Sequence, residues 1–168
     1  MHNSSVRPKI KLPRTKSEWI FDIVGLSVYI GMIVLLIVVW NKLPEQVPAH
    51  YNAVGEVDRW GSKWELVILP FVGLLTTMMM FVFEFHPEIH NYPKRFNEVN
   101  AKQFYLNSRQ LINRLKNITL IVFSLIMYES IAIALGWSSG FGPLFLPIIL
   151  LLSFTPIVIS LVKRRKIR

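Results

Sequence analysis

Four long apolar runs alternate with polar segments along the chain. The runs cover approximately residues 19–40, 64–85, 118–137 and 143–162. Each has about 20 residues, the number that a helix rising about 1.5 Å per residue needs to cross about 30 Å of hydrocarbon. Helices are expected rather than strands, because backbone polar groups inside lipid must be satisfied within their own segment. The pattern therefore predicts an all-α integral membrane protein, built as a bundle of four transmembrane helices.

The polar segments differ from one another. Residues 1–16 have no apolar period and contain two prolines, which predicts a basic tail ahead of a four-span membrane domain at 17–168. The loop 41–63 also lacks a continuous period, and its glycines indicate tight turns. Residues 86–117 begin as an irregular connector and continue as a predicted helix with Asn97 at its N-cap. We expect this helix to run on into the third span, giving a long third helix extended into the cytoplasm.

The helical part of 86–117 has two kinds of surface. An apolar stripe recurs at helical spacing and is predicted to be the packing face: Phe104, Leu111, Leu115 and Ile118. The polar side chains are expected to point away from that stripe: Arg109, Asn113, Arg114 and Lys116. A stripe of this kind more often packs within its own protein than against a partner.

The basic residues are placed unevenly. The chain has a net charge of +9 and a mean hydropathy of +0.42. All but three of its 19 Lys and Arg residues lie in three segments, 1–16, 86–117 and 163–168. Because basic residues accumulate on the cytoplasmic side, both termini and 86–117 are predicted to be cytoplasmic, and 41–63 to face outward. The basic segments are expected to contact the bilayer's anionic lipids at that face. This bias already accounts for the charge, so nucleic-acid binding is not expected.

Three acidic residues fall within the predicted spans, where charge is costly. Asp22 and Glu84 lie near the cytoplasmic ends of their helices, so hydration or a nearby base is the simpler account of both. The candidate bases are Lys16, Lys94 and Arg95. Glu129 lies near the middle of the third span and is expected to face the bundle interior. Neighbouring hydroxyls could bond it: Tyr128, Ser124 and Ser130. A structural contact is the simpler account, and a small proton- or ion-coupled transporter that uses Glu129 stays open.

Metal-ligand candidates rest on histidine and carboxylate side chains, since the chain has no cysteine. One candidate site is His86, Glu88 and His90. Two histidines four residues apart on a helix could bind zinc, but Pro87 argues against helical geometry at His86. The outward loop offers a second set, His50, Glu56 and Asp58, on the other side of the bilayer. A metal-dependent membrane enzyme is therefore a further open alternative. No cofactor is assigned, and enzymatic activity is the less favoured interpretation.

The outward loop carries the most specific pattern, "LPEQVPAHYNAVGEVDRWGSK" at 43–63. Its matching positions are Leu43, Pro44, Pro48, His50, Asn52, Gly55, Asp58, Trp60, Gly61, Ser62 and Lys63. The pattern resembles a recurrent motif of bacterial membrane proteins, a domain of unknown function also found at the start of SdpI-like immunity proteins. A second stretch, "NYPKRFNEVNAKQFY" at 91–105, is similar to a pattern of four-span relatives. SdpI-like proteins are longer, with additional spans after this domain.

SdpI-like proteins protect cells from the sporulation-delaying-protein toxin, so the resemblance implies an immunity or sensing role in a bacterial cell membrane. The outward loop would recognise a peptide toxin or an envelope component. The candidate ligand-binding residues are His50, Asn52, Gly55, Asp58, Trp60, Gly61 and Lys63. The two glycines are expected to form turns and the polar residues a binding face. In such proteins the toxin-bound form holds a repressor at the membrane. Helix 97–117 is therefore, by analogy, a candidate surface for a cytoplasmic regulator.

Overall fold

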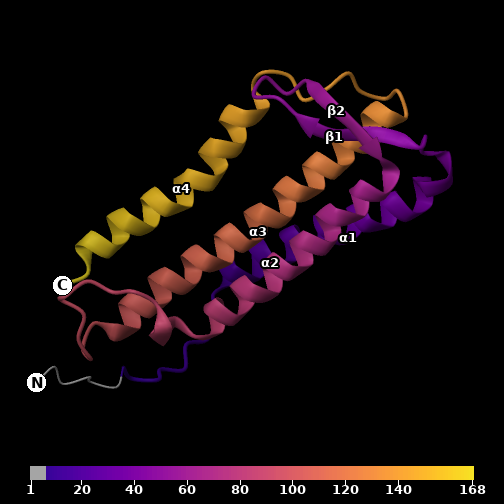
Figure 1. Ribbon diagram of the computed structural model, residues 1–168. Coiled ribbons are helices and arrows are strands. Elements are labelled where there is room, and N and C mark those ends of the chain that lie inside the picture. The colour runs from indigo at the N-terminus through magenta and orange to yellow at the C-terminus, as the bar shows by residue number, and fades with distance from the viewer. Residues whose placement is uncertain (1–6) are drawn as a thin grey trace, which may run out of the picture.

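The computed structural model describes residues 7–168, so the first six residues of the predicted tail lie outside the described part. Four helices carry the architecture: α1 (Lys16–Val39), α2 (Ile68–Phe85), α3 (Ala101–Ala134) and α4 (Phe145–Lys166). All four are long and apolar enough to cross a membrane. The predicted fold class, an all-α membrane protein built on four helices, is confirmed (Figure 1).

Two short strands lie within the loop 41–63, where the apolar pattern did not reveal them. β1 (Gln46–Tyr51) and β2 (Val57–Ser62) pair antiparallel, and the hairpin lies across one end of the bundle (Figure 1). Short 3₁₀ turns join it to the helices, η1 (Trp40–Lys42) before it and η2 (Lys63–Val67) after it. We call this end of the molecule the hairpin end.

The opposite end, which we call the termini end, gathers both ends of the described chain. Arg7 donates to the Glu88 carbonyl at 2.8 Å, and Arg95 donates to the Ile167 carbonyl at 3.1 Å. The connector between α2 and α3 therefore holds the N-terminal segment and the C-terminus beside each other.

Helix α3 is central, because it contacts α1, α2 and α4 as well as β1. Its 34 residues span about 51 Å at 1.5 Å per residue, well beyond the about 30 Å of a hydrocarbon layer. The prediction of a long third helix is confirmed. The extra length lies at the termini end (Figure 1).

Side-chain caps set where the helices begin. Thr15 caps α1: its hydroxyl accepts from the Glu18 N–H, and the Glu18 carboxylate accepts from the Thr15 N–H. Helix α3 begins later than predicted, with Asn100 at the N-cap position. The predicted cap, Asn97, closes the preceding turn instead, and its side-chain oxygen accepts from the N–H groups of Val99 and Asn100.

The packing face predicted for the first half of α3 is wrong. Leu111, Leu115 and Ile118 are only half-buried, and Phe104 alone of that stripe is enclosed. The enclosed polar positions include three that the pattern predicts to point away, together with one more: Arg109, Asn113, Lys116 and Asn117. Lipid accepts an apolar face as readily as a protein interior does, whereas charged side chains need partners. The polar face therefore turns inward.

Candidate functional site

The hairpin rests on an apolar core at the end of the bundle. The core comprises buried side chains from α1, β1, η2, α3 and the residue after η1: Leu36, Val39, Leu43, Val47, Leu66, Met127 and Ile131. Val47 and Pro48 of β1 are fully enclosed, whereas most of β2 is exposed. Strand β1 is therefore anchored to the helices, and β2 forms the outer strand.

A change of register brings His50 and Asp58 together. The register shifts on both sides of His50, which lies opposite Arg59, so Asp58 has no assigned partner across the ladder. Bulges of this kind re-aim side chains. The His50 Nδ1–H donates to the Asp58 carboxylate at 2.6 Å, and the two side chains are 64% and 42% exposed. These two predicted site residues form one surface pair.

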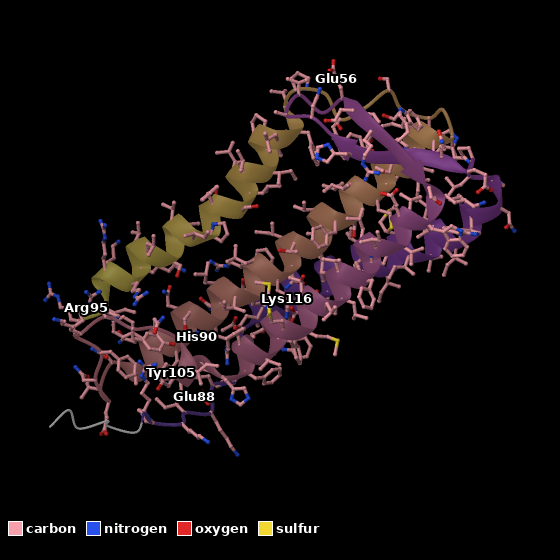
Figure 2. All side chains as sticks on the ribbon, in the orientation of Figure 1. Glu56, Glu88, His90, Arg95, Tyr105 and Lys116 are labelled. Carbon is pink, nitrogen blue, oxygen red and sulfur yellow. The ribbon has the colours of Figure 1, made fainter. Side chains whose placement is uncertain are left out.

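Asn52 and Gly55 build the turn between the strands, whose tip carries Glu56 (Figure 2). The Asn52 side-chain oxygen accepts from the N–H groups of Val54 and Glu56, each at 3.0 Å. Gly55 has a φ of +80°, which favours glycine. A Cβ there would lie 2.6 Å from the Gly142 carbonyl oxygen in the α3–α4 connection. These two predicted site residues therefore shape the turn and seat it against the bundle.

We expect Gly55→Ala to destabilise the hairpin end by roughly 1–3 kcal/mol, because alanine is strained at this φ and its Cβ overlaps backbone. Thermal melting of the purified chain in detergent micelles measures the effect. Gly31→Ala is the matched control: a Cβ there meets nothing within 4 Å, and alanine should raise helix stability by roughly 0.5–1 kcal/mol. Identical melting of Gly55→Ala and the unmodified chain would contradict this assignment.

The remaining predicted site residues lie along β2 and just after it. A Cβ at Gly61 would lie 2.1 Å from a Glu65 carboxylate oxygen, so glycine lets Glu65 of η2 fold back over the strand. The Lys63 ammonium lies 5.6 Å from the Trp40 ring centroid. Trp60 is 51% exposed on β2. Gly61 thus makes a packing contact, Lys63 also pairs with the Glu45 carboxylate at 2.9 Å, and Trp60 presents an exposed aromatic surface.

A cavity of about 630 Å³ lies beneath the hairpin, and we call it the hairpin pocket. Its lining combines the hairpin with η2, the first turn of α2, α3, the α3–α4 connection and the start of α4. Three predicted site residues line it, His50, Asn52 and Gly55. Its volume lies in the range of roughly 300–1,000 Å³ that small-ligand pockets occupy. The pocket can therefore hold a side chain or a small group.

Polar groups occupy two sides of the hairpin pocket. The Tyr51 hydroxyl lies 2.7 Å from the Ser130 hydroxyl. Burial raises the pKa of the Tyr51 phenol; the Ser130 bond opposes this rise, and the charge of Glu129 adds to it. Tyr51 is thus a neutral phenol at physiological pH. Elsewhere in the lining, Arg59 donates to the Glu65 carboxylate at 2.8 Å.

Several pocket residues lie outside the loop motif, and the sequence did not predict that they belong to this site: Glu65, Ile126, Ser130, Phe141, Phe145 and Leu146. They come from segments that the fold brings under the hairpin. No local pattern connects them, because each is an ordinary span or connector residue in its own segment. Only the helix packing places them around one cavity.

A second polar cluster lies at the termini end between α1, α2 and α3, and we call it the buried polar network. It comprises three acids, three bases and two amides: Glu18, Asp22, Glu84, Arg14, Arg109, Lys116, Asn113 and Asn117. Lys116 lies among the helices (Figure 2), with its ammonium 2.6 Å from Glu84 and 3.0 Å from Asp22. Arg14, just ahead of α1, pairs with the same two acids. The formal charges within the network balance.

The prediction of which bases neutralise Asp22 and Glu84 is therefore wrong. Arg14 and Lys116 neutralise them, in place of the expected Lys16, Lys94 and Arg95. Both acids are also buried rather than hydrated, with Glu84 1% and Asp22 6% exposed. A signal was available, since four polar residues of α3 recur on one helical face: Arg109, Asn113, Lys116 and Asn117.

Glu129 lies in the part of α3 that is nearer the hairpin end. Helix α3 ends at Ala134, which places Glu129 about 8 Å along the axis from the end of the helix. Its carboxylate accepts a hydrogen bond from the Ser138 hydroxyl in the α3–α4 connection. The expected partners do not bond it among the described residues: Tyr128, Ser124 and Ser130. Tyr128 is 44% exposed. The transporter alternative that uses Glu129 therefore stays a prediction.

His86 and His90 do not share a helix face. Helix α2 ends at Phe85 and a short 3₁₀ turn, η3 (Pro87–Ile89), follows, in agreement with the effect expected of Pro87. The His86 Nδ1 lies 3.1 Å from the Glu88 carboxylate, and the His90 Nε2–H donates to the Phe83 carbonyl at 2.9 Å. Burial lowers the pKa of His90, and this hydrogen bond partly opposes the shift. Within residues 7–168, no three His, Cys, Asp or Glu side chains are grouped so that they could hold a metal ion.

One family model matches the part of the chain that contains the hairpin. Residues 28–74 match the family model described as Domain of unknown function (DUF1648). The matched stretch runs from α1 through the hairpin into α2. An uncharacterised protein of Archaeoglobus fulgidus is 39% identical over 75 residues, which cover 40% of this chain and 37% of that protein. No solved structure matches. The chain is a membrane protein that carries a stretch similar to this domain, and neither match names SdpI-like proteins or a toxin.

Proposed function

We propose that the chain is a membrane protein of the immunity or sensing type and that its hairpin pocket binds a peptide toxin or an envelope component. In this proposal the chain lies in a bacterial cell membrane with both termini in the cytoplasm and the hairpin outside. One observation carries it: a cavity of about 630 Å³ lies directly under the most specific motif of the chain and is lined by motif residues. A cytoplasmic regulator would then meet the termini end, where most of the basic residues lie.

Two features favour a peptide as the ligand. The pocket combines apolar walls with the Tyr51 and Ser130 hydroxyls and the Arg59–Glu65 pair, which suits apolar side chains attached to a polar backbone. In addition, the described sheet contains only β1 and β2, so β2 has an open edge. An extended peptide can add to such an edge through backbone hydrogen bonds. The exposed His50–Asp58 pair would then contribute specificity at the surface.

Filling the hairpin pocket is expected to abolish protection. Cells that produce the chain should survive purified sporulation-delaying-protein toxin at concentrations that kill cells carrying an empty vector. Ile126 lines the pocket, so Ile126→Trp should lower the tolerated toxin concentration by at least about tenfold, the change that a loss of ~1.4 kcal/mol in binding produces. Survival curves measure the effect, and immunoblots of membranes confirm equal abundance.

The matched control is Ile148→Trp, at a position that is 50% exposed on α4 and outside the pocket lining. This variant should protect as well as the unmodified chain. Equal protection by Ile126→Trp would contradict the role of the pocket. Absence of protection by the unmodified chain would contradict this toxin as the ligand.

A further inference from the structure

An apolar groove separates α4 from the rest of the bundle. Helix α4 runs alongside α3 on the side opposite α2 (Figure 1). Between them lies a groove of about 670 Å³, walled mainly by aliphatic side chains of α3 and α4 and by Phe21 of α1. Helix α4 buries only Pro156 and Ser160. The described chain therefore leaves the groove open toward the surrounding lipid.

Two basic side chains line this groove, Arg114 of α3 and Lys163 of α4. Arg114 lies 20 residues before the end of α3, and Lys163 lies 18 residues after the start of α4. At 1.5 Å per residue, these positions are about 30 and 27 Å from the hairpin ends of their helices. That distance is close to the thickness of a hydrocarbon layer, so both cations lie at headgroup depth.

These two cations have no acidic partner in the part of the chain that the structure describes. Neither forms an ion pair there, and the Arg114 guanidinium lies 5.9 Å from the Phe21 ring centroid. By contrast, Arg14, Arg109 and Lys116 each form an ion pair with an acidic side chain. The groove thus ends at two uncompensated positive charges.

A polar recess of about 390 Å³ adjoins the same end of the groove, and the two share Lys163. Its polar lining consists of Gln103, Asn107, Gln110, Lys163 and Lys166. Asn107 donates to Ser160, which ties α3 to α4 at this point. Neither the groove nor the recess is lined by an acidic residue. Groove and recess together form an amphipathic site with an apolar channel and a basic, amide-rich end.

We propose that this site binds one anionic phospholipid of the surrounding bilayer. One acyl chain lies along the groove, the phosphate lies between Arg114 and Lys163, and the headgroup enters the recess near Gln110 and Lys166. A second copy of the chain is a poorer occupant, because a symmetric partner would bring the same basic residues toward uncompensated cations. A phosphate on an acyl chain supplies the opposite charge and the apolar surface at matching depths.

Lipid binding to the full chain, purified in detergent, tests the proposal. Native mass spectrometry compares dioleoylphosphatidylglycerol with dioleoylphosphatidylcholine, which have the same acyl chains. The anionic lipid should bind at least about fivefold more tightly than the neutral lipid. Arg114→Gln and Lys163→Gln should each weaken the binding of the anionic lipid by about fivefold. Lys102→Gln, an exposed change of the same charge on α3, should leave the preference intact.

A second pair of variants tests the groove itself. Val122→Trp fills the groove and should weaken the binding of both lipids. Val72 is 39% exposed on α2 and lies outside the groove, so Val72→Trp should weaken the binding of neither lipid. Equal affinity for the two lipids would overturn the proposal, as would a Lys102→Gln loss equal to that of Lys163→Gln. A dimer that Val122→Trp dissociates would also overturn it, since a second copy would then occupy the groove. If Val122→Trp fails to fold, Arg114→Gln and Lys163→Gln still test whether the anionic lipid binds at this site.

Discussion

Replacing Lys116 by methionine is expected to lower the free energy of unfolding by about 3–5 kcal/mol. The Lys116 ammonium lies 2.6 Å from Glu84 and 3.0 Å from Asp22, and its side chain is 4% exposed. Methionine keeps much of the volume but leaves two buried carboxylates with Arg14 as their one remaining base. Denaturant titration in detergent micelles measures the loss, and the melting temperature should fall by roughly 10 °C.

Lys102→Met is the matched control, because Lys102 is exposed on the same helix and its loss should change stability by less than about 0.5 kcal/mol. A double variant, Lys116→Met with Glu84→Gln, removes one charge of each sign and should recover most of the stability. Buried ion pairs can often be replaced as a unit at little net cost. If Lys116→Met unfolds with the same free energy as Lys102→Met, the buried polar network does not hold the three helices together.

The four helices could be predicted from the sequence because membrane crossing demands a long, continuous apolar segment. The requirement acts on about 20 neighbouring residues at once, so the signal is strong. Which face of a membrane helix points into the bundle is harder to predict. In water an apolar stripe marks the interior, but in lipid both faces can be apolar, so the stripe led to the wrong face of α3. The polar repeat through Arg109, Asn113 and Asn117 is the better signal, since only the interior supplies partners for it.

The hairpin was hidden from sequence reasoning for a local reason. A strand is recognised by alternation with a period of two, and the register shifts around His50 break that alternation. Pro48 within β1 weakens the strand signal further. The loop motif was recognisable, but several of its positions serve folding. Asn52 and Gly55 build the turn, and Gly61 admits the side chain of Glu65. Much of the motif's specificity therefore follows from the shape of the hairpin, and the pocket beneath it depends on tertiary packing.

Replacing Arg109 by methionine is expected to release the segment that precedes α1. The Arg109 guanidinium donates to the Leu12 and Pro13 carbonyls at 2.7 and 2.8 Å and to the Glu18 carboxylate at 2.7 and 2.9 Å. Methionine leaves a carboxylate that is 1% exposed without its base. Loss of a buried partner costs about 3–5 kcal/mol, so the hydrogen-bonded amides of Thr15, Glu18 and Trp19, where this segment joins α1, should exchange hydrogen at least about 100-fold faster. Hydrogen exchange with mass spectrometry measures this.

Arg114→Met is the matched control, because Arg114 has the same side chain on the same helix and no ion pair among residues 7–168; exchange in the N-terminal segment should not change. Release should also loosen Arg14, which belongs to that segment and reaches Asp22 and Glu84. The losses from Arg109→Met and Arg14→Met should therefore overlap, so that the double variant loses less stability than their sum. Additive losses, or unchanged exchange in Arg109→Met, would show that Arg109 does not anchor the segment. Overlapping losses of stability would mean that Arg109 holds the segment before α1 in place, and that this segment in turn holds Arg14 between Asp22 of α1 and Glu84 of α2.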